Sequence, residues 1–137
     1  MAIPLRTARL VLGLSVGLAG TLGGLPLSAQ APPTGGHLFP PQELGLLEGP
    51  DRDAWQKPDQ IMDTLHIADS DAVAEIGAGG GWFTIRLSRR VGQNGVVFAE
   101  DIQAPILEAL KRRVQNQGLT NVQPVLGTAT DPGLPEG

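Results

Sequence analysis

The sequence contains no cysteine, and only two of its 137 residues are histidine. Without cysteine the chain cannot form a disulfide, a thiolate zinc site, an iron–sulfur cluster or a cysteine nucleophile. His37 and His66 lie 29 positions apart, and neither has a second histidine at helical spacing, which is not the pattern of a zinc site. We therefore expect no metal centre.

Basic residues are also few, because 10 Lys and Arg against 14 Asp and Glu give a formal net charge of −4. Proteins held on nucleic acid or on anionic lipid by charge alone carry an excess of basic residues. The short basic clusters at 89–90 and 111–113 are typical of solvated helix faces. The composition therefore indicates no nucleic-acid partner, and contact with a membrane is expected only through the N-terminus.

The N-terminus has the pattern of a secretory signal peptide. Arg6 and Arg9 precede an uncharged, largely apolar run over residues 10–27, and small residues follow up to Ala31. This order predicts a leader over residues 1–31, cleavage after Ala31 and an exported protein, periplasmic or extracellular. An uncleaved leader that anchors the protein in a membrane is the alternative.

Two further regions follow the leader. Residues 32–50 are rich in proline and glycine without sustained periodicity, which predicts a linker or N-terminal arm, whereas residues 51–137 form the domain. The expected elements are a helix over 58–67, a strand over 72–76, a helix from the glycines that follow to Gly92, a strand over 95–99, a helix over 105–117 and an edge strand over 122–126. Strands that alternate with helices form an α/β fold with a parallel sheet.

The most informative segment is the glycine turn, residues 77–81, which directly follows the first expected strand of the domain. Glycines at the carboxyl end of such a strand let the backbone turn sharply and approach a ligand closely. A phosphate-binding loop of the nucleoside-triphosphatase kind is excluded, because Trp82 stands where a lysine is required. A dinucleotide fingerprint counted from Gly77 fits poorly, because Trp82 would take the place of its third glycine.

Counted in steps of two, the same segment reads acid-x-Gly-x-Gly-x-Gly. Its members are Glu75, Gly77, Gly79 and Gly81. This spacing resembles motif I of the Rossmann-like, class I methyltransferases that depend on S-adenosylmethionine, and residues 38–137 resemble a group of exported methyltransferases. The resemblance implies methyl transfer from S-adenosyl-L-methionine, bound by the glycine turn with Ala78 included, to an acceptor that the sequence does not identify.

Further residues correspond to the family's cofactor contacts. An acid at the end of the second strand holds the ribose in the family, and the next apolar side chain packs on the adenine, which implies Asp101 and Ile102 here. Glu100 is the rival acid, but it points to the opposite side of the strand, so we favour Asp101. Glu75 corresponds to the acid near the cationic methionyl end of the cofactor, with a purely structural buried carboxylate as the alternative.

Five more residues, at three places in the sequence, are candidates for a ligand contact or for the core. Thr128 stands where many family members have an acid that bonds the adenine amino group. Its hydroxyl can accept one hydrogen bond, and Asp131 is a nearby acid. Trp55 and Gln56 belong to a segment that often folds over the cofactor in such enzymes, although Trp55 also suits an ordinary core position. Trp82 and Phe83 are expected to pack in the core rather than to contact a ligand. No catalytic residue is assigned.

The resemblance implies a sheet of about seven strands, of which this sequence accounts for three. We therefore predict a fragment, the N-terminal half of a class I domain, in which residues 72–76 form an apolar, unpaired sheet edge. A complete small domain that pairs with another chain along this edge is the alternative. Two other functions stay open, an NAD-dependent oxidoreductase half-domain, disfavoured by Trp82, and a non-catalytic module that binds a nucleoside or a protein.

Overall fold

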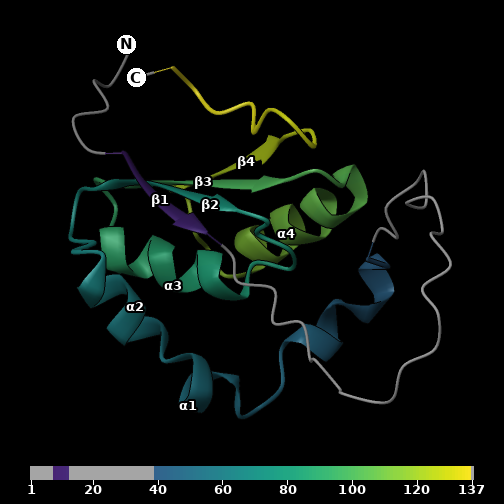
Figure 1. Ribbon diagram of the computed structural model, residues 1–137, viewed down its shortest axis with the longest axis horizontal. Helices are drawn as coiled ribbons and strands as arrows, with labels where there is room; N and C mark the ends of the chain where they lie inside the picture. Colours follow the sequence, from purple (N-terminus) through teal and green to yellow (C-terminus); the bar gives the residue numbers. More distant parts are fainter. Residues whose placement is uncertain (1–7, 13–38, 137) are drawn as a thin grey trace, which may run out of the picture.

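The computed structural model describes residues 8–12 and 39–136, so the predicted cleavage site and part of the predicted linker lie outside the described residues. The elements are β1 (Ala8–Leu12), η1 (Pro41–Leu47), α1 (Arg52–Gln56), α2 (Pro58–Thr64), β2 (Ala72–Ile76), α3 (Trp82–Val91), β3 (Val96–Asp101), α4 (Ala104–Asn116) and β4 (Val122–Leu126). From β2 onward, strands and helices alternate as the sequence predicts (Figure 1).

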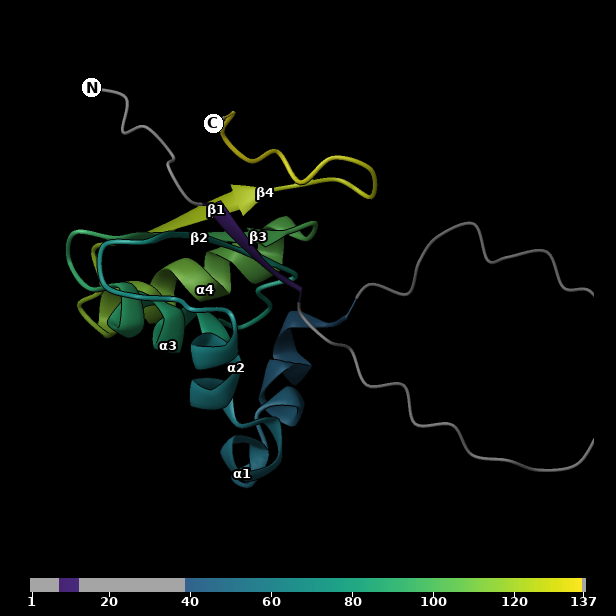
Figure 2. The same ribbon diagram turned by 60° about the vertical axis from the view of Figure 1, so that its left-hand side comes forward.

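The four strands form one parallel sheet in the order β1-β2-β3-β4. Because β2, β3 and β4 are neighbours in chain order, crossovers of one hand place their connecting helices on a single face. Figures 1 and 2 show α3 and α4 on that face, and within the described residues the other face carries no helix. The segment after β4 turns back over β4, where a Cβ added to Gly133 would lie 3.1 Å from the Leu126 carbonyl oxygen.

The prediction that residues 72–76 form an unpaired edge is wrong. Strand β1 pairs with β2 in parallel, from Ala8 opposite Ala72 to Leu12 opposite Ile76. Strand β2 is apolar and deeply buried, and the free amides of such an edge favour any extended segment that completes the hydrogen-bond ladder. The segment that does so comes from within the predicted leader, which the sequence pattern assigned to export and not to the sheet.

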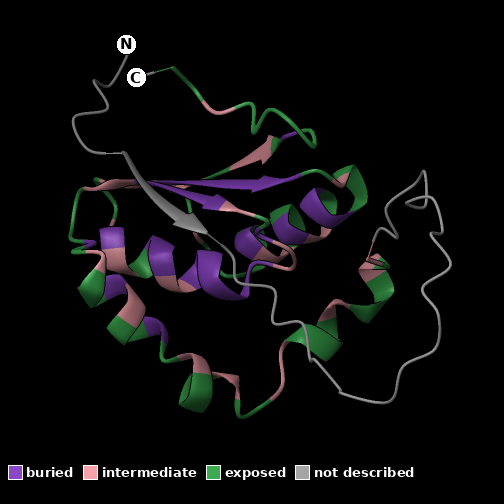
Figure 3. Ribbon diagram, viewed as in Figure 1, coloured by how far each residue is buried: buried purple, intermediate pink, exposed green. Residues whose placement is uncertain are grey.

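The core lies between the sheet and the helices. Its main cluster of buried residues is Met62, Ile67, Val73, Trp82, Phe83, Leu87, Val91 and Val97, and a smaller cluster under α4 is Ala78, Ala99, Leu110 and Val114. Figure 3 shows buried residues along β2 and β3 and on α3 and α4. The predicted packing roles of Trp82 and Phe83 are confirmed, since both side chains are 7% exposed. This packing fixes the carboxyl ends of β2 and β3, where the glycine turn begins.

Element boundaries differ from the predictions in two places. Helix α2 ends at Thr64 and not at residue 67, because the chain turns at His66, whose φ of 53° is left-handed. Strand β3 continues to Asp101, so both acids that were expected to follow the strand belong to it. Within residues 8–12 and 39–136, none of the helices combines the length and the apolar character needed to cross a membrane.

Candidate functional site

The glycine turn has a left-handed backbone conformation that residues other than glycine rarely adopt. Gly77, Gly79 and Gly81 have φ angles of 72°, 56° and 87°. A Cβ added at Gly77 or Gly79 would meet no atom within 4 Å, so both positions face open space. At Gly81 the added Cβ would lie 3.4 Å from the Leu110 side chain, an ordinary van der Waals contact, so this position faces α4 and not open space. Gly77 and Gly79 therefore leave the backbone approachable, whereas Gly81 is covered by α4.

The two acids that end β3 hold the turn in place. The Gly77 amide donates to Oε2 of Glu100 at 3.2 Å, and the Gly79 amide donates to Oδ2 of Asp101 at 3.1 Å. Between them, the Ala78 amide donates to the backbone carbonyl of Glu100 at 2.7 Å. Three successive amides of the turn thus bond to two residues of β3, so the conformation of the turn depends on these acids.

Asp101 keeps acceptor capacity for a ligand. Its side chain is buried, and its Oδ1 accepts one hydrogen bond from the Gln103 amide at 2.9 Å. A carboxylate offers about four acceptor positions, and the two backbone amides use two of them. The next side chain, Ile102, is 49% exposed. An acid with spare acceptors beside an exposed apolar side chain suits a ribose with an attached base, so the donor set fits a nucleoside.

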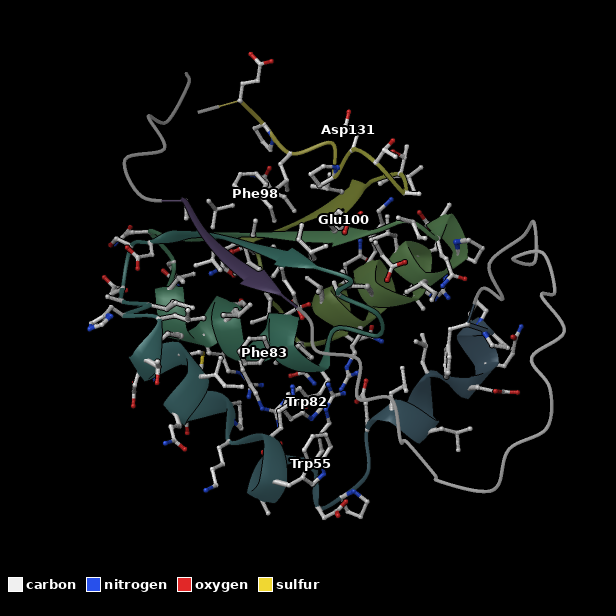
Figure 4. All side chains as sticks on the ribbon, in the orientation of Figure 1. Trp55, Trp82, Phe83, Phe98, Glu100 and Asp131 are labelled. Atoms are coloured by element: carbon white, nitrogen blue, oxygen red, sulfur yellow. The ribbon has the colours of Figure 1, made fainter. Side chains whose placement is uncertain are left out.

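Glu100 has a different environment from Asp101. Figure 4 shows Phe98 on the sheet face away from Trp82 and Phe83, and Glu100, two residues along the strand, shares the face of Phe98. Its carboxylate lies against Gly127, where an added Cβ would overlap it. Burial raises the pKa of Glu100, while its hydrogen bond from the Gly77 amide opposes the shift. Glu100 therefore bridges the turn and the end of β4, a role that the sequence pattern did not predict.

Glu75 is a buried acid on the helix face of β2. The Thr84 hydroxyl of α3 donates to its Oε2 at 2.5 Å, whereas the structural alternative expected backbone amides as partners. Burial raises the pKa of Glu75 to about 7, with the Thr84 hydrogen bond and the charge of Arg52 opposing the shift and that of Asp101 adding to it. Buried acids with raised pKa values near a ligand-binding turn are candidates for contact with a cationic group.

The segment before β2 lies against the glycine turn. In this arm, Glu48 accepts a hydrogen bond from Nη1 of Arg113 at 2.5 Å, and the same nitrogen donates to the Gly80 carbonyl at 3.0 Å. A Cβ added to Gly80 would lie 3.6 Å from the side chain of Leu44 in η1. Part of the predicted linker is therefore docked on the domain and covers the turn at Gly80.

A second contact fastens α1 to α3 around Trp82. The guanidinium carbons of Arg52 and Arg86 lie 4.0 and 3.9 Å from the centre of the Trp82 ring. Arg86 also forms a two-pronged ion pair with Asp53, at 2.5 and 2.8 Å, and donates to the Trp82 carbonyl at 2.6 Å. These contacts hold the start of α1 close to the end of the glycine turn, and the sequence patterns did not single out either arginine.

The remaining predicted site residues have the following places. Trp55 is 56% exposed, so the alternative that put it in the core is wrong, and Gln56 accepts a hydrogen bond from Nε of Arg52 at 2.7 Å. The Thr128 hydroxyl accepts from the Asp131 amide at 3.0 Å and so closes its own loop. Figure 4 shows Asp131 and Trp55 at opposite sides of the molecule. The structure thus brings Glu75, the glycine turn, Asp101 and Ile102 together and uses Thr128 locally.

Known proteins resemble this chain over the region that carries the turn. Residues 73–137 match the family model for a methyltransferase domain. The protein-L-isoaspartate O-methyltransferase of Methanococcus aeolicus is 31% identical over 70 residues, which are 51% of this chain and 32% of the relative. The crystal structure of a SAM-dependent methyltransferase from Aquifex aeolicus aligns with a TM-score of 0.66 and 26% identity over 72% of this chain and 53% of that chain.

A second solved structure, a protein-L-isoaspartate O-methyltransferase, aligns with a TM-score of 0.50 and 32% identity over 52% of this chain and 22% of that chain. The chain therefore spans about a third of the curated relative that it matches and about half of the Aquifex structure.

Proposed function

We propose that this protein binds S-adenosyl-L-methionine at the carboxyl ends of β2 and β3 and takes part in methyl transfer. The match of residues 73–137 to the family model for a methyltransferase domain and the similarity to SAM-dependent methyltransferases support this. One observation carries the proposal. The open glycine turn at Gly77 and Gly79 lies directly beside Asp101, a buried acid with unused acceptor positions.

Each part of the site has a separate task in this proposal. Asp101 accepts hydrogen bonds from the ribose hydroxyls, and Ile102 packs on the adenine. Glu75 faces the cationic end of the cofactor, and the glycines let the backbone approach it. When bound, S-adenosylmethionine supplies a methyl group on a positively charged sulfur, which makes the methyl carbon electrophilic. The residues of this chain therefore hold and orient, and the rate gain comes mainly from alignment with an acceptor.

Replacing Asp101 by alanine tests the proposal. We expect the unchanged protein to bind S-adenosylhomocysteine in a calorimetric titration and to bind NAD far more weakly, because Trp82 replaces the third glycine of a dinucleotide site. Asp101→Ala removes a charged acceptor for two hydroxyls, so affinity for S-adenosylhomocysteine should fall about 30-fold or more. Glu108→Ala, on the exposed face of α4, is the control and should leave affinity unchanged.

Tighter binding of NAD than of S-adenosylhomocysteine would favour the oxidoreductase alternative. Equal affinities of the Asp101→Ala and unchanged proteins would remove Asp101 from the site. If the protein at its full natural length binds S-adenosylhomocysteine but transfers no label from methyl-labelled S-adenosylmethionine to any component of an extract from its source, the domain is a binding module and not an enzyme.

We also propose that residues 1–31 are a leader that exports the protein. The support is the order of Arg6, Arg9, the apolar run and the small residues that end at Ala31. The intact mass of the protein from its source tests this, because cleavage after Ala31 removes the mass of the leader, whereas an anchored protein retains it.

Cleavage after Ala31 would also remove β1, and this has a measurable consequence. We expect a chain that starts at Pro32 to exchange the β2 amide hydrogens that point toward β1 about tenfold faster or more than the full chain, because their pairing with β1 is lost. The amides of α4, which do not contact β1, are the internal control. Unchanged exchange in β2 would mean that β1 does not protect this edge in solution.

A further inference from the structure

Arg52 has hydrogen-bonding capacity that the described contacts do not use. Its Nε donates to Gln56 at 2.7 Å, and its Nη1 donates to the Leu47 carbonyl at 2.6 Å. A guanidinium carries five N–H donors, so further donors stay available. Within residues 8–12 and 39–136 this arginine forms no ion pair. The two other arginines near the turn differ, because Arg86 is paired with Asp53 and Arg113 with Glu48.

The position of Arg52 is fixed beside the ligand-binding turn. Its guanidinium carbon lies 4.0 Å from the centre of the Trp82 ring, and Trp82 is buried and directly follows Gly81. Arg52 is also close enough to Glu75 for their charges to interact. Burial lowers the pKa of Arg52, and the charges of Glu48 and Glu75 oppose that shift. Helix α1 thus places a cation at the same end of the site as the buried acid of β2.

Arg52 and Glu75 together suit a ligand that carries a positive and a negative charge at the same end. Three acids, Glu75, Glu100 and Asp101, gather around the turn. They attract a cation, but they repel any carboxylate that the same ligand carries. The amino-acid end of the proposed cofactor has an ammonium group, a sulfonium group and a carboxylate. Glu75 matches the first two groups, and a cation is needed to match the third.

We propose that Arg52 binds the α-carboxylate of the amino-acid end of the cofactor, while Glu75 faces its positive charges. This inference rests on the proposed function and goes beyond it by assigning Arg52 of α1 a direct contact with the ligand's carboxylate. A planar guanidinium binds a carboxylate through two parallel hydrogen bonds, and stacking on Trp82 restricts its motion before the ligand arrives. Arg52 is then a determinant of specificity for cofactors that retain their amino-acid end.

Two ligands separate this role from a structural one. S-adenosylhomocysteine carries the amino-acid end, and 5′-methylthioadenosine has the same nucleoside and thioether without it. We expect Arg52→Met to weaken binding of S-adenosylhomocysteine by about 10- to 100-fold and binding of 5′-methylthioadenosine by less than about threefold, both by calorimetry. Methionine keeps an apolar stem over Trp82. Arg52→Lys keeps the charge but not the planar guanidinium, so it should lose less affinity for S-adenosylhomocysteine than Arg52→Met does.

Arg86→Met is the matched control, because Arg86 lies over the same ring and holds α1 through Asp53. It should change the affinities for the two ligands by the same factor. The inference is overturned if Arg52→Met weakens the binding of both ligands by the same factor, which would show a structural role. It is also overturned if the variant weakens the binding of neither ligand. Failure of the proposed function looks different, because the unchanged protein would then bind neither ligand.

Discussion

Glu75→Gln is expected to stabilise the unliganded protein above pH 7 and to weaken its binding of S-adenosylhomocysteine. Burial raises the pKa of Glu75 from 4.5 to about 7, so the folded state binds its proton more tightly than the unfolded state does. The free energy of unfolding therefore falls as the pH rises from about 4.5 to 7 and stays lower above that range. Glutamine carries no such penalty, and its carbonyl can still accept the Thr84 hydrogen bond.

The measurement is urea unfolding of both proteins between pH 5 and pH 8. We expect the variant to be more stable by roughly 1–3 kcal/mol at pH 8, and we expect this gain to shrink toward pH 5. Glu108→Gln is the control, because Glu108 lies on the surface and pairs with Lys111. Affinity for S-adenosylhomocysteine at pH 8 should fall about tenfold or more in Glu75→Gln alone. A variant less stable than the unchanged protein at pH 8 would contradict this view of Glu75.

A substitution that stabilises the fold but weakens ligand binding is typical of residues that serve function. A buried acid with a single hydroxyl partner costs stability, and proteins retain such groups where a ligand repays the cost. If Glu75→Gln stabilises the fold without loss of affinity, Glu75 does not contact the ligand.

The sequence predicted those elements whose signals are local. Strands β2 and β4 have the predicted bounds, because short apolar runs next to turn residues identify them. Helix α3 was expected because Phe83, Leu87 and Val91 recur at helical spacing and Gly92 follows them. The grouping of Glu75 with the glycine turn was also predictable, because these residues are neighbours in the chain.

Contacts between distant segments were not predictable in the same way. The place of β1 beside β2 depends on which extended segment completes a sheet edge, and no pattern within residues 8–12 indicates it. The bond between Glu100 and the Gly77 amide depends on the register of two strands. Arg52 stands between two aspartates in a short helix, which predicts only a polar surface, and its contact with Trp82 appears once α1 packs on α3.

Gly79→Ala is expected to reduce the affinity for S-adenosylhomocysteine about 10- to 100-fold with only a small loss of stability. Gly79 has a φ of 56°, and no atom lies within 4 Å of an added Cβ. The protein alone therefore has room for the methyl group and bears only the strain of a left-handed alanine, about 1 kcal/mol. A ligand whose atoms approach the turn closely meets that methyl group directly, at a cost typical of overpacking.

Gly118→Ala is the control that separates the backbone strain of a left-handed alanine from the clash of its methyl group with the ligand. Gly118 follows α4, with a φ of 66° and equally free surroundings, but it lies away from the turn. The two variants should lower the free energy of unfolding by similar amounts. Only Gly79→Ala should weaken the binding of S-adenosylhomocysteine. Equal affinities would mean that the open space at Gly79 is not where the cofactor lies. A large loss of affinity at Gly79 alone would place the cofactor against the backbone of this turn, because the two substitutions differ only in location.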